Sequence, residues 1–200
     1  MKRVILSIVL AGITTSVFAA NTNGFYVGAS LGQSETDLYT TVQSGASLDE
    51  KGPSYGAFIG FNINKYFATE LNYNKFAKAD LDFRAGSQFT MDGYTFNPGV
   101  GGSVDVDVQS LGLSLIAKYP IHNYVVPYAK IGLQRYEHES LTRTQNASVK
   151  TNTKDNDTYH GFGMESNISK NFATRVSYDE YSMNEETDIK NYAFSLIYKF

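Results

Sequence analysis

Five charged residues lie in segments of the sequence where large apolar residues take every second position. They are Glu70, Lys118, Lys130, Glu165 and Arg175. In each segment the charge falls on the alternate positions, among mostly small or polar residues. If the segments are strands of one closed sheet, all five side chains point to its interior. An unpaired buried charge costs several kcal/mol, so these residues predict acid-to-base pairing inside the protein.

The tripeptide His138-Glu139-Ser140 contains residue types that a serine hydrolase uses. A hydrolase needs a hydrogen bond between the histidine and the serine, an orienting acid and an oxyanion hole. His138 and Ser140 would share one face of a strand, but the nearby acids Glu137 and Glu139 lie on the other face. We therefore interpret the tripeptide as the polar end of a strand, and we predict no catalytic residue and no enzyme activity.

The composition argues against several other kinds of site. The chain has no cysteine, which excludes thiolate metal sites and cysteine nucleophiles. Its three histidines, His122, His138 and His160, lack the spacing of a metal motif such as H-E-x-x-H. We therefore expect no metal and no cofactor. The 20 acidic residues outnumber the 17 basic ones, and a net charge of -3 disfavours nucleic acid as a partner.

The segment that ends the sequence shows most clearly which elements hold these side chains. In residues 191–200 large apolar residues alternate with mostly small or polar ones, and the apolar set has aromatic residues at both ends. A period of two predicts a strand with one apolar face. Aromatic residues at both ends of that face, with aliphatic residues between them, are typical of a strand that faces lipid.

Seven earlier segments alternate in the same way, so we expect eight strands of about 10 residues each. The connections between them alternate in length. Short turns are expected near Asn64, His122 and Lys170, and long polar stretches at residues 33–53, 77–102, 139–157 and 183–188. Short turns on one side and long connections on the other are typical of outer membrane barrels. The predicted fold is all-β, a transmembrane eight-stranded antiparallel up-and-down β-barrel.

The start of the chain has the features of a secretory signal peptide. Lys2 and Arg3 precede an apolar run, and small residues surround a cleavage position after Ala19. We predict a signal peptide over residues 1–19 and a single outer membrane β-barrel domain over residues 20–200. No later window approaches the ~20 apolar residues that a spanning helix needs, so a membrane location requires a barrel.

Four segments, residues 56–64, 117–121, 163–165 and 173–178, resemble strands of the outer membrane protein A family and its OmpX-like relatives. In that family, interior acids and bases form a salt-bridge cluster that blocks the lumen and opens a narrow ion path when partners exchange. The resemblance implies these roles for Glu70, Lys118, Glu165 and Arg175, with Lys130 in the same interior cluster. A lysine that the family often places in the first strand is Ser30 here, which predicts a smaller cluster.

The resemblance also implies a location and partners. The location is the outer membrane of a Gram-negative bacterium, with membrane lipids and lipopolysaccharide around a monomeric barrel. Tyr198 and Phe200 would form the signal read by the barrel assembly machinery, and periplasmic chaperones would act during biogenesis. The family's periplasmic peptidoglycan-binding domain is not expected, because the sequence ends at the barrel.

Three functions fit this fold. The first is a structural role in envelope integrity, with surface-exposed loops and an ion-permeable lumen gated by the salt-bridge cluster. The alternative is an adhesin or immune-evasion barrel whose outer loops bind host or phage ligands. Its best contact candidates are Phe89, Tyr94 and Phe96, although packing within the loop explains them equally well.

A lipid A-modifying hydrolase is the third function, and it is disfavoured because the residues around His138 do not resemble the lipid A deacylase motif. A soluble periplasmic carrier barrel is the alternative at the level of the fold. It would need an apolar interior, whereas the alternation here places charges and glycines together on one face.

Overall fold

The computed structural model describes residues 23–37, 40–91, 94–122, 124–144, 147–183 and 187–200. The predicted signal peptide, residues 1–19, lies outside these residues and stays a prediction. Eight strands form the wall of a barrel: β1 (Gly24–Asp37), β3 (Lys51–Asn62), β4 (Phe67–Lys75), β7 (Gly102–Lys118), β8 (Val126–Thr144), β9 (Ser148–Asn167), β10 (Phe172–Met183) and β11 (Thr187–Lys199). Three further strands lie outside the wall: β2 (Thr40–Asp49), β5 (Ala79–Met91) and β6 (Tyr94–Phe96).

The wall strands pair in the order β7-β4-β3-β1-β11-β10-β9-β8, and the pairing of β8 with β7 closes the ring. Every pair is antiparallel. Closure leaves no unpaired sheet edge in the barrel, which is the condition for a sheet to lie in lipid. The prediction of an eight-stranded antiparallel barrel is confirmed. Within the described residues, no helix has the length and apolar character needed to cross a membrane.

Short turns lie at one end of the barrel, which we call the turn end. They follow β3, β7 and β9, as the sequence predicts near Asn64, His122 and Lys170. Two of them use the same local chemistry. The Asn64 side-chain oxygen accepts hydrogen bonds from the backbone N–H groups of Tyr66 and Phe67, two and three residues on, at 2.7 and 2.8 Å. The Ser169 hydroxyl does the same at 3.3 and 3.0 Å, so a side chain fixes each tight reversal.

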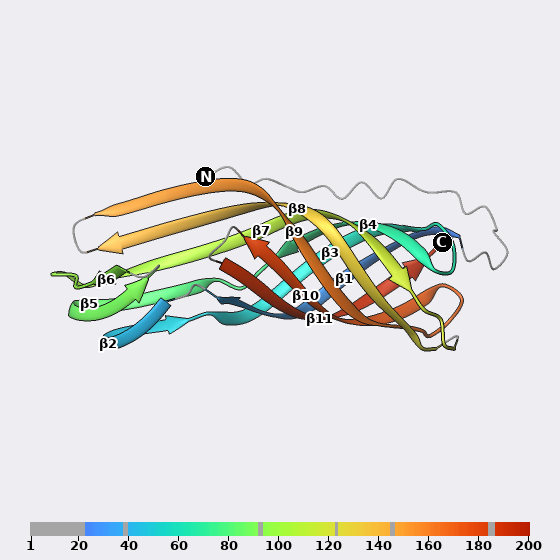
Figure 1. The fold of residues 1–200 in the computed structure, drawn as a ribbon, viewed down its shortest axis with the longest axis horizontal. Coiled ribbons are helices and arrows are strands. Elements are labelled where there is room, and N and C mark those ends of the chain that lie inside the picture. Colours follow the sequence, from blue (N-terminus) through green and yellow to red (C-terminus); the bar gives the residue numbers. More distant parts are fainter. Residues whose placement is uncertain (1–22, 38–39, 92–93, 123, 145–146, 184–186) are drawn as a thin grey trace, which may run out of the picture.

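At the opposite end, the outer end, the strands continue far beyond the barrel (Figure 1). We call this extension the protruding sheet; it comprises β2, β5, β6 and the outer parts of β7, β8 and β9. Pairing between β7 and β8 runs without interruption from Lys118↔Tyr128 to Gly102↔Thr144. Pairing between β8 and β9 runs from Val126↔Glu165 to Arg143↔Ser148. The long polar stretches that the sequence predicts as loops therefore consist largely of strands.

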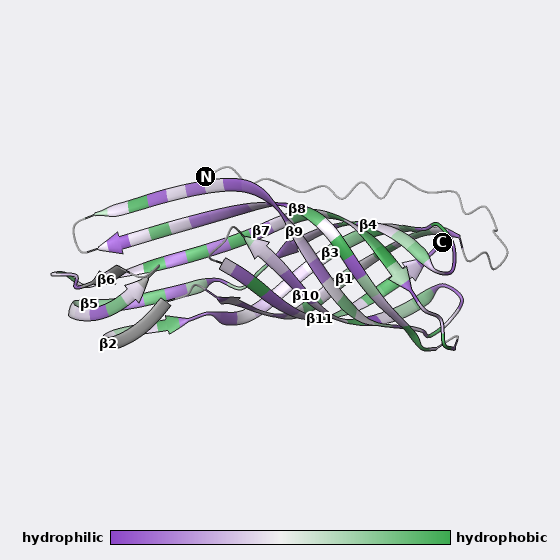
Figure 2. Cartoon of the chain, viewed as in Figure 1, coloured by the Kyte–Doolittle hydropathy of each residue, from purple (hydrophilic) through white to green (hydrophobic). Residues whose placement is uncertain are grey.

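The strands of the barrel carry more hydrophobic residues than the protruding sheet does (Figure 2), and many large apolar residues of the barrel are exposed on its outside. The exposed outward residues of the wall include Leu31, Leu113, Leu133, Phe162 and Phe194. Aromatic rings gather at both borders of this apolar band. Phe172, Tyr198 and Phe200 contact one another near the turn end, and Phe162, Tyr178 and Tyr192 do so toward the outer end. This arrangement is the aromatic girdle of a membrane barrel.

Glycines on the interior face make room for large side chains from neighbouring strands. A Cβ atom at Gly60 would overlap the ring of Tyr26, and one at Gly28 would overlap the ring of Phe58. A Cβ at Gly132 would overlap Tyr159. An eight-stranded barrel has space only for its own side chains, and the pairing of glycines with rings fills that space.

Two apolar groups of buried residues lie inside. The lower apolar layer, near the turn end, consists of Tyr26, Ala68, Ile116, Tyr128, Ala173 and Ile197, with Phe58 packed against it. The upper apolar layer, near the outer end, consists of Phe76, Ala79, Val106, Val108, Tyr136, Tyr159, Tyr181, Met183 and Ile189. The interior face of β10 passes through both, because Arg175, Ser177 and Asp179 lie between Ala173 and Tyr181. The charged side chains are thus held between two apolar groups.

Candidate functional site

Arg175 is the centre of the interior charges. Its Nη1 donates to Oε2 of Glu70 at 2.7 Å, and its Nη2 donates to Oε2 of Glu165 at 3.3 Å. Glu165 is the direct partner of Arg175 across β9 and β10, whereas Glu70 reaches it from β4 on the other side of the lumen. All three side chains are 2–3% exposed. One guanidinium therefore bridges two carboxylates from distant strands.

Glu165 is the second branching point. Besides Arg175, its carboxylate contacts Nζ of Lys118 at 3.2 Å and Nζ of Lys199 at 2.6 Å. Lys118 also donates to the side-chain oxygen of Asn62 at 3.0 Å. The Lys199 side chain is 22% exposed, so the network reaches water at the turn end. Five charged side chains from five strands form this network, which we call the Arg175 network: Glu70, Lys118, Glu165, Arg175 and Lys199.

Lys130 belongs to a separate pair. Its Nζ lies 2.9 Å from Oδ1 of Asp179, with side-chain exposures of 6% and 4%. Ser177 donates to the other oxygen of the same carboxylate at 3.2 Å. Of the five charges singled out in the sequence, the structure thus joins four and places Lys130 one step further toward the outer end.

Aromatic rings surround the Arg175 guanidinium. Its central carbon lies 5.0 Å from the ring centres of Phe58 and Tyr128, and 5.8 Å from that of Tyr26. Tyr26 also donates its hydroxyl to Glu70 at 3.1 Å. Rings above and below a cation favour it electrostatically and exclude water from its carboxylate contacts. The lower apolar layer therefore fixes the position of the central ion pairs.

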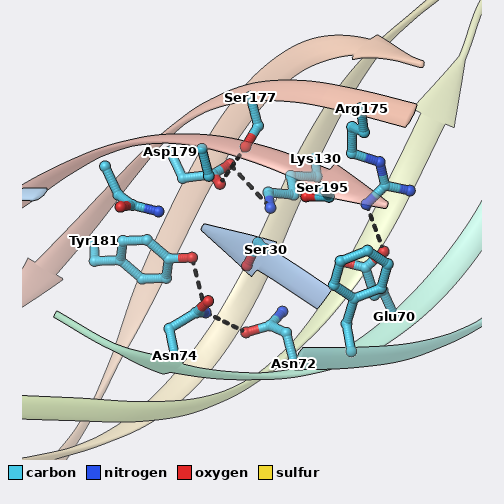
Figure 3. Close-up of a pocket in the computed structure, with 13 residues that line it drawn as sticks. Ser30, Glu70, Asn72, Asn74, Lys130, Arg175, Ser177, Asp179, Tyr181 and Ser195 are labelled. Carbon is cyan, nitrogen blue, oxygen red and sulfur yellow. Dashed lines mark hydrogen bonds and ion pairs between the residues drawn. The ribbon is translucent and has the colours of Figure 1, made fainter. Parts of the chain in front are cut away.

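A polar cavity separates the Arg175 network from the Lys130–Asp179 pair (Figure 3). Its lining includes Ser30, Asn72, Asn74, Ser177 and Ser195. Asn74 donates to the side-chain oxygen of Asn72 and to the Tyr181 hydroxyl, both at 3.1 Å. These bonds connect the cavity to the upper apolar layer, where Tyr181 stacks on Tyr159 with ring centres 4.9 Å apart.

The residue types in the interior are suited to holding charge in place. Four cations, Lys118, Lys130, Arg175 and Lys199, are set against three carboxylates, Glu70, Glu165 and Asp179. Every one of these cations touches a carboxylate. Removal of Asp179 would leave Lys130 without a carboxylate partner, and an unpaired buried charge is strongly unfavourable. The paired charges fill the lumen between the lower and the upper apolar layers.

Two members of the interior charge set were not singled out in the sequence. Asp179 and Lys199 lie on the same alternate parity as Arg175 and Ser195, so a complete parity count of β10 and β11 would have found them. Parity gives the face of a residue and not its partner. For that reason the separate pairing of Lys130 could not be deduced from the sequence alone.

The other predicted residues lie apart from this interior. His138 is in the protruding sheet, where burial lowers its pKa and its Nε2 has no hydrogen-bond partner within the described part of the chain. No hydrogen bond between His138 and Ser140 is found there. Phe89 is buried and packs on Phe83 with ring centres 5.6 Å apart, while the side chains of Tyr94 and Phe96 lie outside the described residues. Phe200 is half-exposed and bonds through its backbone to Phe25.

Comparisons with known proteins agree with the fold. The chain is 25% identical to outer membrane protein A of Salmonella typhi over 180 residues, which is 86% of this chain and 45% of that protein. The chain therefore spans less than half the length of this relative.

Solved barrels share the fold at low identity. Neisserial surface protein A has a TM-score of 0.56 at 16% identity, with 88% of this chain and 97% of that chain covered. OprG of Pseudomonas aeruginosa has a TM-score of 0.56 at 11% identity, covering 90% and 97%. Ail of Yersinia pestis has a TM-score of 0.53 at 14% identity, covering 88% and 99%.

The sequence profile of the outer membrane protein beta-barrel domain matches residues 5–200, nearly the whole chain. With the closed wall, the apolar outward band and the aromatic girdle, this match places the protein in the outer membrane of a Gram-negative bacterium. The chain belongs to the outer membrane protein beta-barrel domain family.

Proposed function

We propose that this protein is a closed structural barrel that holds a rigid β-sheet at the cell surface, where the sheet contacts other molecules. The observation that carries the proposal is the uninterrupted pairing of β7, β8 and β9 from the barrel to the outer tips of the strands. A hydrogen-bonded sheet keeps its shape where a free loop does not, so side chains on it keep fixed spacings.

Salt bridges across strands add to this rigidity. On the outward face, Lys154 contacts Glu137 at 3.2 Å and Lys150 contacts Glu139 at 2.7 Å. Cross-strand pairs of opposite charge stabilise neighbouring strands. Ail, whose name describes attachment and which has been solved with a heparin analogue bound, is one of the barrels of similar fold. This likeness supports a role of the protruding sheet in attachment, which is the adhesin alternative.

A strain lacking the protein, complemented with variants, separates the structural role from attachment. The double variant Lys150→Glu with Lys154→Glu changes the charge of the protruding sheet alone. The matched control, Lys65→Glu with Lys170→Glu, makes the same change in the turns at the other end. We expect the first variant to reduce adherence to sulfated glycan surfaces while resistance of the cells to detergent is kept. The control should preserve both. Loss of adherence in both variants alike would contradict a role of the sheet.

A narrow ion path is a second candidate, because Glu165 is shared by three cations and so has alternative partners. Planar bilayer recordings test it. We expect the wild-type barrel to be silent, since the upper apolar layer occupies the outer end of the lumen. Steady current through the wild-type barrel would contradict the closed state and favour the ion path.

A further inference from the structure

A groove crosses the lipid-facing wall of the barrel over β4, β7, β8 and β9. Two cross-strand pairs of large residues border it, Leu113↔Leu133 and Leu115↔Ile131. Its floor is the pair between them, Ser114↔Gly132, and threonines lie at its ends: Thr69 on β4 and Thr158 on β9. The bordering residues are exposed, Leu133 most of all at 69%. We call this feature the lipid-side groove.

Arg135 lies just beyond the groove toward the outer end. It follows Leu133 by two residues on β8, so both side chains point outward, and it is opposite Leu111 of β7. Two residues of a strand span about 7 Å, which is within the reach of an arginine side chain. Arg135 is exposed, and in the part of the chain that the structure describes no hydrogen bond or ion pair involves it.

The lack of a partner distinguishes Arg135 from the other lysines and arginines on the outward face of β8 and β9. Arg143 pairs with Asp105, Lys150 with Glu139 and Lys154 with Glu137. The carboxylate nearest along the strand, Glu137, is already occupied. Asn152 and Gln109 donate to it at 2.6 and 3.1 Å, in addition to Lys154. Arg135 therefore has an exposed guanidinium, and the nearest carboxylate on its strand already has other partners.

The depth of Arg135 coincides with the border of the apolar band. Along the outward face of β8, Ile131 and Leu133 are followed by Arg135 and then by Glu137. Lipid headgroups lie at this level of a membrane barrel, with acyl chains directly below. A guanidinium binds phosphate through two parallel N–H···O bonds, and this geometry is the reason that arginine is favoured at phosphate sites.

We propose that the lipid-side groove and Arg135 together bind one phosphorylated lipid of the outer leaflet, with an acyl chain in the groove and a phosphate on the guanidinium. The proposal rests on the membrane location that the family establishes, and it is independent of the role assigned above to the protruding sheet. Both parts of the ligand are needed, because neither an apolar groove in lipid nor a single surface arginine selects one molecule.

Titration of the refolded barrel in an uncharged detergent tests this proposal. The probes are lipid A, the same lipid with its phosphates removed, and inorganic phosphate, with binding followed by native mass spectrometry. Only variants that show the same heat-dependent gel shift as the wild type are compared. We expect Arg135→Gln to weaken lipid A binding about tenfold or more, as loss of a charge-assisted contact does. The lipid A affinity of Arg135→Lys should lie between those of the wild type and Arg135→Gln, since lysine keeps the charge but cannot make two parallel hydrogen bonds to one phosphate.

Arg143→Gln is the matched control, because it removes an exposed arginine from the same face of the same strand. It is expected to bind lipid A like the wild type. Thr69→Phe fills one end of the groove and should also weaken binding, with Arg135 unchanged. The proposal would be overturned if Arg135→Gln bound lipid A as tightly as the wild type does. It would also be overturned if the wild type bound lipid A equally well with and without its phosphates. Inorganic phosphate binding as tightly as lipid A, or a dimer that Thr69→Phe converts to monomer, would overturn it too.

Discussion

The barrel interior and the protruding sheet use the same acid–base pairs in opposite surroundings. In the interior, Arg175, Glu70 and Glu165 are 2–3% exposed, and aromatic rings cover the guanidinium. On the protruding sheet, Lys150 and Glu139 are 57% and 40% exposed. Buried charges cannot lose a partner without a large cost, whereas exposed ones exchange it for water. We therefore expect the interior pairs to contribute more to the stability of the barrel than the exposed pairs of the protruding sheet do.

The largest effect is expected from Arg175→Met. The substitution leaves Glu70 and Glu165 with less positive charge nearby, and removal of one partner of a buried pair costs about 3–5 kcal/mol. Urea unfolding in detergent micelles, followed by the gel shift between unheated and heated samples, measures this loss. Replacing Glu70 with Gln in the same chain should restore part of the stability. An unfolding midpoint equal to that of the wild type would show that the interior is wet enough to solvate the carboxylates.

A smaller effect is expected from Gly60→Ala, which tests packing without changing charge. A Cβ at Gly60 would overlap the Tyr26 ring, and overpacking of this kind costs about 1–3 kcal/mol. Displacement of Tyr26 would also disturb its hydrogen bond to Glu70. Gly99→Ala is the control, because a Cβ at that position would meet nothing within 4 Å. If both substitutions have the same small effect on the urea midpoint, the interior is looser than described.

Lys150→Ala on the protruding sheet should have a minor effect. An exposed pair contributes about 0–1 kcal/mol and is screened by salt. Amide hydrogen exchange of β8 and β9 measures the change locally, with unfolding of the barrel as a second readout. We expect slightly faster exchange near Glu139 at low salt, no difference at about 1 M salt, and an unchanged barrel. Destabilisation of the whole barrel would mean that the two regions are coupled.

The smallest effect concerns pH and His138. Burial lowers the pKa of this imidazole below its ordinary value of 6.5, so the folded sheet favours the neutral form. The unfolded segment binds the proton more readily than the folded sheet does. The contribution of His138 to stability is therefore fully present above pH 6.5 and decreases as the pH falls through the lowered folded-state pKa. The opening free energy of β8, obtained from hydrogen exchange after correction for the intrinsic exchange rate at each pH, should therefore fall at acidic pH, and His138→Gln should remove that fall. A pH response that survives His138→Gln would assign it to another group.

The sequence was informative where one face of a strand meets lipid. Alternation of apolar and small residues identified the wall strands, and the charges at Glu70 and Arg175 fell on the interior face because a period of two gives the face directly. The depth of each charged residue in the barrel and the identity of its partner were harder to predict from the sequence. Strands tilt and stagger in a barrel, so residues such as Lys130 and Asp179 meet only once the register is known. The strands of the protruding sheet were missed because residues such as those at 150–157 are polar on both faces and show no alternation.

The difference between the buried and the exposed ion pairs is tested most directly by two double-mutant cycles in the same barrel. One cycle combines Arg175→Met with Glu70→Gln, and the other combines Lys154→Met with Glu137→Gln. Each yields the interaction energy of its pair from urea unfolding in micelles. We expect a coupling energy of several kcal/mol for the buried pair and less than about 1 kcal/mol for the exposed pair. Coupling energies of equal size would contradict the view that burial, and not pairing itself, makes the interior network essential.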